Sequence, residues 1–282
     1  MLPLFIKHPF FACFAFVLLA SCTMDDKPIT EADITGNWLV VSSDPQYNGD
    51  EERDIYLAQK DSIIGPRGLK LISIKAKGIF QQLDSTYNTP GSWLYNNKNQ
   101  QFFVNNAGPG FRAFSGRVMG CKEDTMSIEE KVSLPGASFP VVWHFKKIVA
   151  DSPANYLFVP ANNQWRIRPT ATEDEATLRK KLSVMFHYYS VYFNLVSREA
   201  NYFSPKRVLL PIKYYQHGVG MRDYEMVDNF KAIFYSEEDA RRAYDLVAGT
   251  MKLVRRFPTG KDFVEEYALY FEKLEKAVMS SE

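Results

Sequence analysis

The residues that could perform chemistry in this chain are few and lie far apart. The sequence has four histidines, and the three beyond the N-terminal segment, His144, His187 and His217, show no spacing that would bring two of them together on one helix or strand. Metal sites built on a single element need such pairs. A Gly-x-Ser-x-Gly nucleophile motif and a complete phosphate-binding loop are also missing from the sequence. We therefore expect no metal, no cofactor and no catalytic residues.

One segment, from Tyr214 to Asp223, combines groups that could hold a ligand. It contains two glycines and four polar or aromatic side chains that are the candidate ligand-binding residues, namely Tyr214, Tyr215, His217 and Arg222. Glycine lets the backbone approach a ligand closely, and polar side-chain tips can orient it. The alternative is a strand that runs into a tight turn, with its tyrosines packed at an interface. Other tyrosines could extend a stacking surface: Tyr188, Tyr189 and Tyr192.

The N-terminus has the features of an export signal. Lys7 precedes an apolar run of 11 residues from Phe10 to Ala20. As a helix this run would measure about 16 Å, roughly half of a bilayer core. It predicts a signal peptide over residues 1–21 rather than a membrane-spanning helix.

The end of the run, Leu19-Ala20-Ser21-Cys22, resembles the lipobox of bacterial lipoproteins. The resemblance implies cleavage before Cys22, attachment of a diacylglycerol to its sulfur and acylation of its amine, typically by palmitate. The mature chain would then be attached to a membrane without spanning it. The alternative is a secretory signal that happens to end near a cysteine.

The residues after Cys22 bear on location. Met24-Asp25-Asp26-Lys27 resembles the short acidic export tags of surface lipoproteins in the Bacteroidetes, and a solvated tether without that role is the alternative. We expect a protein of the cell envelope, anchored in the outer membrane, and leave open whether it faces the periplasm or the cell exterior. Cys13 would leave with the signal peptide and Cys22 would be lipidated, so Cys121 has no partner for an intramolecular disulfide. We expect Cys121 to be a small buried residue.

Composition excludes several classes of protein. The chain has 282 residues, of which 46% are hydrophobic and 24% are charged, as in an ordinary globular protein. A formal net charge of +1 gives no basic footprint, so we expect no nucleic acid among its partners.

Residues 34–149 show the pattern of antiparallel β-structure. Eight short runs of β-branched and aromatic residues are separated by Gly, Asn and Pro turns: 36–43, 69–75, 78–84, 91–96, 100–105, 111–120, 125–132 and 139–148. The segment 55–59 could add a strand, and the acidic run 50–54 before it is expected to be a solvated loop rather than a calcium site. Closure into an up-and-down barrel would remove the exposed edges, and an open β-sandwich is the alternative.

Two motifs of this half resemble lipocalin-like domains. The opening Gly36-Asn37-Trp38 is similar to the Gly-x-Trp strand of that family, and Trp143-His144-Phe145-Lys146-Lys147 is similar to its last strand. The resemblance implies that Trp38 plugs the closed end of a barrel. The chain departs from the family in having neither paired cysteines nor a clear Arg partner for Trp38.

The second half changes to a helical period. Residues 150–171 are expected to be a linker, with a short strand at 164–168, and helices should start after Thr172, after Ser236 and near Phe263. Strands are expected at 208–215 and 229–235. The fold class is therefore α+β, with a β-barrel followed by a smaller domain of three helices and two or three strands. The expected division is 1–21 signal peptide, 22–33 tether, 34–149 β-domain, 150–171 linker and 172–282 α+β domain.

Three functional hypotheses follow from these features. The first is a non-enzymatic binding lipoprotein whose β-domain holds a small apolar or glycan ligand or docks a partner, with the α+β domain packed alongside. The second is an envelope scaffold or complex subunit, whose tyrosine-rich second half docks other envelope proteins. The third is a hydrolase of envelope polymers, for which the sequence offers no organised nucleophile, base or metal.

Overall fold

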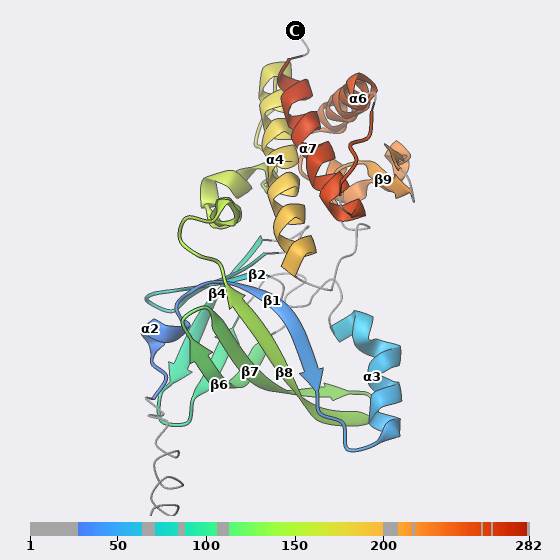
Figure 1. Cartoon of the computed structure of the whole chain (residues 1–282). Helices are drawn as coiled ribbons and strands as arrows, with labels where there is room; N and C mark the ends of the chain where they lie inside the picture. The colour runs from blue at the N-terminus through green and yellow to red at the C-terminus, as the bar shows by residue number, and fades with distance from the viewer. Residues whose placement is uncertain are drawn as a thin grey trace, which may run out of the picture.

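The computed structural model describes residues 28–63, 71–83, 88–105, 113–199, 208–215, 218–254, 256–260 and 262–280. A β-barrel occupies the first half of the chain and a mainly helical part occupies the second half (Figure 1). Cys22 and His217 lie outside the described residues, so the structure does not place these two predicted site residues.

Eight antiparallel strands form a closed barrel in which every strand pairs with its neighbours in sequence order. The barrel closes where the last strand pairs with the first, with Trp38 opposite Lys147. The up-and-down barrel is thereby confirmed and the open sandwich is excluded. The strands are β1 (Gly36–Pro45), β2 (Leu71–Lys75), β3 (Ile79–Leu83), β4 (Asn88–Asn96), β5 (Gln101–Asn105), β6 (Phe114–Lys122), β7 (Thr125–Leu134) and β8 (Ala137–Lys147).

Large apolar side chains face the inside of the barrel. On β8 they alternate with more exposed residues, and the buried positions are Phe139, Val141, Trp143 and Phe145. This is the period of a strand that has one buried face. An eight-stranded barrel is just wide enough for side chains to fill it or for one small ligand to enter.

The N-terminal segment covers one end of the barrel. Ile34, in the short helix α2 (Glu31–Ile34), is fully buried, and its carbonyl accepts a hydrogen bond of 2.9 Å from the indole nitrogen of Trp38. The ammonium of Lys147 lies 5.2 Å from the Trp38 ring centroid, so a lysine supplies the cation for which the sequence shows no arginine. Cys121 is half-buried and its thiol donates to the carbonyl of Asp33 at this end.

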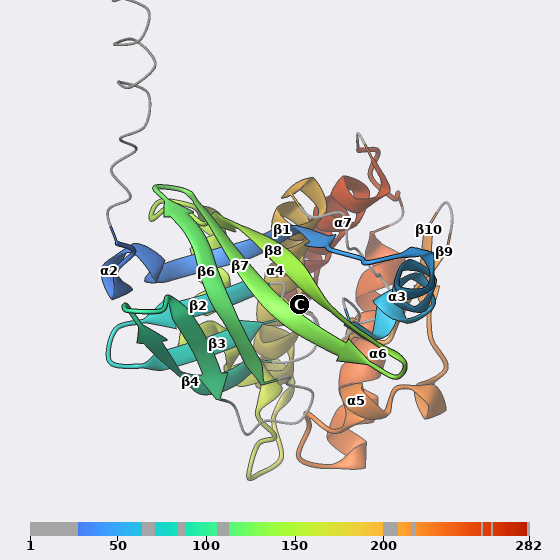
Figure 2. The ribbon, with the colours of Figure 1, turned by 90° about the horizontal axis from the view of Figure 1, so that it is seen from below.

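A helix follows the far end of β1, where the sequence predicted a loop and a strand. α3 (Asp50–Ile63) begins with Asp50, Glu51 and Glu52, whose charges suit the N-terminus of a helix. Its Tyr56 is buried, with ring centroids 5.6 Å from Tyr47 and 5.9 Å from Phe139. The loop at 50–54 and the strand at 55–59 were therefore wrong. Figure 2 shows α3 and β4 on opposite sides of the barrel.

The link between the halves is made of two short 3₁₀ helices, η1 (Pro153–Phe158) and η2 (Pro160–Arg166). Each starts at a proline, which presets the φ angle of a helical turn. The strand predicted at 164–168 was therefore wrong, and Trp165 is instead buried in the core of the second half.

The second half confirms the three predicted long helices. They are α4 (Glu175–Glu199), α6 (Glu237–Leu253) and α7 (Phe263–Met279). Ser236 caps α6 as expected, with its hydroxyl accepting from the backbone nitrogen of Asp239. At the start of α4, Asp174 accepts from the backbone nitrogen of Thr177 at 2.7 Å and caps the helix, which therefore starts two residues later than the predicted start after Thr172.

The smaller elements of this half differ from the prediction. A two-stranded hairpin, β9 (Ile212–Tyr215) and β10 (Gly218–Met221), replaces the longer strand predicted at 208–215. The strand predicted at 229–235 was wrong, because this segment contains the helical turn α5 (Asp228–Lys231), preceded by η4 (Tyr224–Met226). Phe230, Ile233 and Phe234 are buried there, at the spacing of a helix rather than a strand.

The second half has a core that extends onto the outer face of the barrel. Leu39, Leu71 and Leu83 lie side by side across β1, β2 and β3, and all three belong to the same buried cluster as the helices. Tyr188, Tyr189 and Tyr192 are buried in this cluster, so they form no exposed stacking or docking surface. Among the helices that the structure describes, none combines the length and the hydrophobicity needed to cross a bilayer.

Candidate functional site

The predicted ligand-binding segment folds as the β9–β10 hairpin, with Tyr215 opposite Gly218 and Ile212 opposite Met221. Adjacent residues of a strand point to opposite faces, so the candidate side chains Tyr214 and Tyr215 cannot converge on one ligand. This separation is the main departure from the site that the sequence predicted.

Tyr214 points inward. Its ring centroid lies 4.2 Å from that of Tyr267, and its hydroxyl is buried without a hydrogen-bond partner among the described residues. Burial raises the pKa of Tyr214 well above its ordinary value, and the nearby charge of Arg222 only partly opposes this shift. The phenol therefore stays protonated and packs in the core.

Tyr215 points outward and is exposed. The Lys213 ammonium lies 5.4 Å from its ring centroid, and a Cβ placed on Gly220 would lie 2.9 Å from the ring. The glycine therefore leaves room for the Tyr215 ring to lie across β10, rather than for a ligand. Arg222 is fixed through its backbone: its nitrogen donates to the carbonyl of Pro211 at 2.8 Å and its carbonyl accepts from the hydroxyl of Tyr244 at 2.7 Å.

A groove lies beside the hairpin, bounded by the three elements β10, α6 and α7 and by the connection between the two helices. We call it the hairpin groove. Its volume is about 510 Å³, within the usual range of small-molecule sites. The residues that line it are Gly218, Val219, Met221, Ala248, Met251, Lys252, Val254, Phe257 and Tyr270.

The lining of the hairpin groove is largely apolar. Met221 and Met251 can repack around ligands of different shape, because methionine is unbranched and flexible. Lys252 is exposed and is the one charged residue among the described residues of the lining. Burial raises the pKa of Tyr270 to about 12, so its hydroxyl is a donor at neutral pH. The groove therefore offers an apolar surface with one cation and one phenol.

The sequence pointed to this region, but it identified only one of the three elements that build the groove. Met251 and Tyr270 follow the apolar faces of their helices, which the helical period does detect. Nothing in the sequence shows that these two faces and β10 meet around one space.

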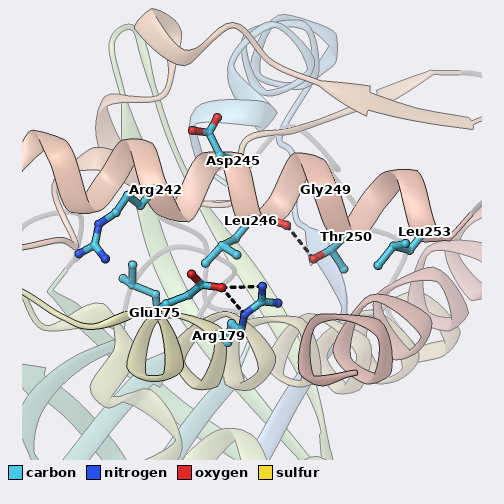
Figure 3. A pocket seen from close by; sticks show the side chains of 9 residues that line it. Glu175, Arg179, Arg242, Asp245, Leu246, Gly249, Thr250 and Leu253 are labelled. Atoms are coloured by element: carbon cyan, nitrogen blue, oxygen red, sulfur yellow. Dashed lines mark hydrogen bonds and ion pairs between the residues drawn. The ribbon is translucent and has the colours of Figure 1, made fainter. Parts of the chain in front are cut away.

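A second groove lies between α4 and α6. We call it the α4–α6 groove; its volume is about 470 Å³. Figure 3 shows Leu246 pointing from α6 toward α4, where Arg179 and Glu175 form an ion pair of 2.7 Å. The remaining lining residues are Leu178, Arg242, Asp245, Gly249, Thr250 and Leu253. Charges of both signs therefore border an apolar floor.

The barrel interior also contains a buried polar pair. Glu130 on β7 accepts a hydrogen bond of 3.0 Å from the indole nitrogen of Trp143 on β8. Trp143 and the apolar neighbours of Glu130 on β7, Ile128 and Val132, belong to the barrel core. The rings of Trp38, Trp93 and Trp143 are among the large side chains of the buried cluster inside the barrel.

The two histidines that the structure describes have structural partners. His144 lies 3.1 Å from the Ser127 hydroxyl and 3.2 Å from an Asp44 oxygen, whereas His187 lies 2.9 Å from a Glu275 oxygen. Within the described ranges, no group of three His, Cys, Asp or Glu side chains is arranged to hold a metal ion.

Comparison with known proteins finds a likeness over part of the chain. No protein-family model matches the chain, and no curated protein sequence matches it. A solved structure of a bovine odorant-binding protein in complex with a selenium-containing odorant is similar over 46% of this chain and 80% of its own, with 10% sequence identity and a TM-score of 0.27. The barrel of this protein is established by its own strand register, and it has the strand number and order of up-and-down barrels such as lipocalins.

Proposed function

We propose that this protein is a non-enzymatic binding lipoprotein of the cell envelope, anchored to the outer membrane through Cys22, which binds a small and mainly apolar ligand in the hairpin groove. The observation that carries the binding function is the groove itself, a space of about 510 Å³ that is lined mostly by apolar residues and lies next to the predicted ligand-binding segment. The large side chains inside the barrel favour this groove over the barrel interior as the ligand site.

The lining distinguishes between the two ligand classes that the sequence left open. Sugars are held by several polar groups placed around the ring, whereas this lining is dominated by Val219, Met221, Met251, Val254 and Phe257. An apolar body gains free energy from leaving water in such a groove. We therefore favour an apolar ligand over a glycan.

Uptake of a hydrophobic dye tests the site. We expect 1-anilinonaphthalene-8-sulfonate to bind with enhanced fluorescence, and we expect the Ala248→Trp variant, which fills the groove with an indole, to weaken binding about tenfold or more. Val149→Trp, at an exposed position away from the groove, serves as the control. Equal dye binding by the Ala248→Trp variant and the native protein would move the site elsewhere, for example into the barrel.

The anchor rests on the lipobox and has its own test. Mass spectrometry of the protein from its native cell should find a diacylglyceryl group on Cys22 and no residue before it. The Cys22→Ser variant should lack the diacylglyceryl group, because the thioether cannot form. An unmodified Cys22 would remove the membrane part of the proposal and leave the hairpin groove untouched.

The α4–α6 groove favours a second candidate function, the docking of an envelope protein. Leu246 and Leu253 lie seven residues apart on α6, and Leu253 is exposed. Charged residues of both signs flank them. Grooves of this kind accept an amphipathic helix, whose apolar positions repeat at three and four residues. A partner that co-purifies with the native protein and with the Leu57→Asp variant, but not with Leu253→Asp, would support this function. A partner that all three proteins retain would contradict it.

A further inference from the structure

Three apolar side chains are exposed side by side on the outer wall of the barrel. Ile79 is 52% exposed, Leu94 is 73% exposed and Phe103 is 44% exposed. Leu94 and Phe103 are direct cross-strand partners, and Ile79 pairs with Ser92, two residues before Leu94. We call these three residues the β3–β5 patch. Exposed apolar groups that gather in this way mark contact surfaces for proteins or membranes.

Basic residues surround the patch. Lys75 is the cross-strand partner of Ile79, and Arg117 pairs with Gln101, two residues before Phe103. Lys77 and Lys98 are exposed in the turns that follow β2 and β4. The acidic neighbour on this wall is Glu129, the cross-strand partner of Arg117. Cations around an exposed apolar centre are the arrangement that attracts proteins to bilayers containing anionic lipid.

The N-terminal segment joins the barrel one residue beyond Leu94 along β4, on the inner face of that strand and so on the opposite face from the patch. The hydroxyl of Tyr95, the residue after Leu94, donates a hydrogen bond of 3.2 Å to the carbonyl of Ile29. Cys22 precedes Ile29 by seven residues. A chain of that length spans at most about 25 Å even when fully extended. A lipid on Cys22 would therefore hold Ile29, and the end of the barrel that it joins, within about one tether length of the bilayer.

The helical half lies elsewhere on the barrel. Its core joins the outer faces of β1 and β2 and the Leu83 end of β3, whereas Ile79 is at the opposite end of β3. Figure 1 shows α2, where the N-terminal segment enters, on the side of the barrel away from α6 and α7. Contact of the patch with a membrane would therefore leave the hairpin groove and the α4–α6 groove open to other molecules.

We propose that the β3–β5 patch rests on the surface of the bilayer that holds the lipid anchor. Leu94 and Phe103 enter the boundary between headgroups and acyl chains, and Lys77, Lys98 and Arg117 lie against anionic headgroups. The orientation that this contact imposes rests on the proposed lipidation of Cys22, whereas the affinity of the patch for lipid does not.

Quenching of tryptophan fluorescence by brominated lipid tests the contact in the lipidated protein. The native tryptophans that the structure describes are buried, so the native protein supplies the background. After reconstitution into vesicles of phosphatidylglycerol and brominated phosphatidylcholine, the Leu94→Trp variant should shift its emission to the blue and be quenched. The Leu57→Trp variant is the matched control, because Leu57 is 50% exposed but lies on α3. Equal quenching of the two variants would overturn the proposal.

Binding of the full chain without its lipid separates this proposal from the anchor. The Cys22→Ser protein should float with phosphatidylglycerol vesicles and bind phosphatidylcholine vesicles less well. The double substitution Leu94→Asp with Phe103→Asp should weaken flotation about tenfold or more, whereas Leu57→Asp should not. Salt at about 1 M reduces the Debye length to about 3 Å and should also weaken binding. If the double substitution left flotation unchanged, the proposal that the β3–β5 patch binds the lipid surface would be overturned.

The outcomes distinguish the two proposals and the two classes of partner. If Cys22 were unmodified but flotation still depended on the patch, the proposed lipid anchor would be refuted and the proposed membrane contact of the patch would stand. If Cys22 were lipidated but the Leu94→Trp variant were not quenched, the proposed lipid anchor would stand and the proposed membrane contact of the patch would be refuted. Loss of a co-purifying protein from the Leu94→Asp variant, with flotation unchanged, would show that the patch contacts a protein and would overturn the lipid assignment.

Discussion

At Gly116 the wall of the barrel leaves no room for a side chain. The residue pairs with Glu130 in the β6–β7 ladder, and a Cβ placed on it would lie 2.6 Å from the carbonyl oxygen of Glu129 and 2.6 Å from a methyl group of Ile128. We expect Gly116→Ala to lower the free energy of unfolding by about 1–3 kcal/mol, because the backbone of two paired strands must shift. Urea denaturation measures the change.

Gly120 supplies the matched control on the same strand. A Cβ at this position would meet nothing within 4 Å, so Gly120→Ala should leave the midpoint of denaturation nearly unchanged. Equal losses from the two substitutions would contradict the prediction, because a Cβ at Gly120 meets no close neighbour and Gly→Ala by itself lowers the entropy of the unfolded chain.

Buried phenols make stability depend on alkaline pH. Burial raises the pKa of Tyr270 to about 12, whereas the ordinary value that applies to the unfolded chain is 10.0. The unfolded state therefore loses its proton first, and stability that is fully present below pH 10 is lost as the pH rises toward 12. One such group contributes a slope of at most about 1.4 kcal/mol per pH unit. Denaturation of the native protein and of Tyr270→Phe at pH 10 to 12 should show the smaller slope in the variant.

The exposed Tyr235 provides the comparison for this pH effect. Tyr235→Phe should retain the slope of the native protein between pH 10 and 12. Identical slopes for the Tyr270 variant and the native protein would show that Tyr270 loses its proton equally readily in the folded and unfolded states.

At the scale of single elements, the start of α7 depends on one cap. The Asp262 carboxylate accepts hydrogen bonds from the backbone nitrogens of Val264 at 2.9 Å and Glu265 at 2.8 Å. Loss of such a cap costs about 0.5–2 kcal/mol, so Asp262→Ala should lower the melting temperature measurably. Lys273→Ala, on the exposed side of the same helix, should have little effect. Asp262→Asn should recover much of the loss, because an amide oxygen can also accept these bonds; no recovery would argue against the cap.

The same element scale shows which parts of the fold follow from sequence. The barrel strands are predictable because their apolar residues alternate and Gly, Asn or Pro punctuates their turns. α3 is missed because the short run Ile55-Tyr56-Leu57, with a β-branched and an aromatic residue, fits a strand as well as a helix, while its acidic first turn is the signal of a helix. The helical turn at Phe230 is missed because a short apolar run fits both the two-residue period of a strand and the 3.6-residue period of a helix, and only tertiary packing decides between them.

The candidate site is predictable only in part, for a related reason. The glycine-containing segment does form one wall of the hairpin groove, through Gly218, Val219 and Met221. The burial of Tyr214 depends on Tyr267, which is 53 residues further along the chain. Local patterns carry no information about such a contact, so the direction of the candidate side chains could not be derived from them.

At the scale of the whole molecule, the barrel and the helical half share one buried surface. Leu71 is fully buried on the outer face of β2, paired with Leu39 on one side and Leu83 on the other, and all three belong to the core of the helical half. The row fixes the barrel to the helices through its wall rather than only through the connecting 3₁₀ helices. Near residue 150 the chain changes from strands to helices. We propose that the two halves on either side of this point stabilise each other and unfold together.

This coupling predicts how the molecule unfolds. Leu71→Ala should cost about 2–5 kcal/mol, the range for removing a large buried aliphatic side chain, and it should destabilise both halves together. Far-UV circular dichroism reports mainly on α4, α6 and α7, while hydrogen exchange of β4 to β7 reports on barrel strands distant from the substitution. Leu94→Ala, on the exposed outer wall, is the matched control and should change neither signal.

A shared core should give one denaturation transition by both measurements, with the same shift in midpoint for the Leu71→Ala variant. Two independent halves would instead show a shift in only one signal, because the remaining half would keep its own hydrophobic core. That result would show that Leu39, Leu71 and Leu83 make only a weak contact between two separately stable domains. A common shift would make the barrel and the helical half one cooperative unit, so that a ligand held beside α6 would also stabilise strands of the barrel.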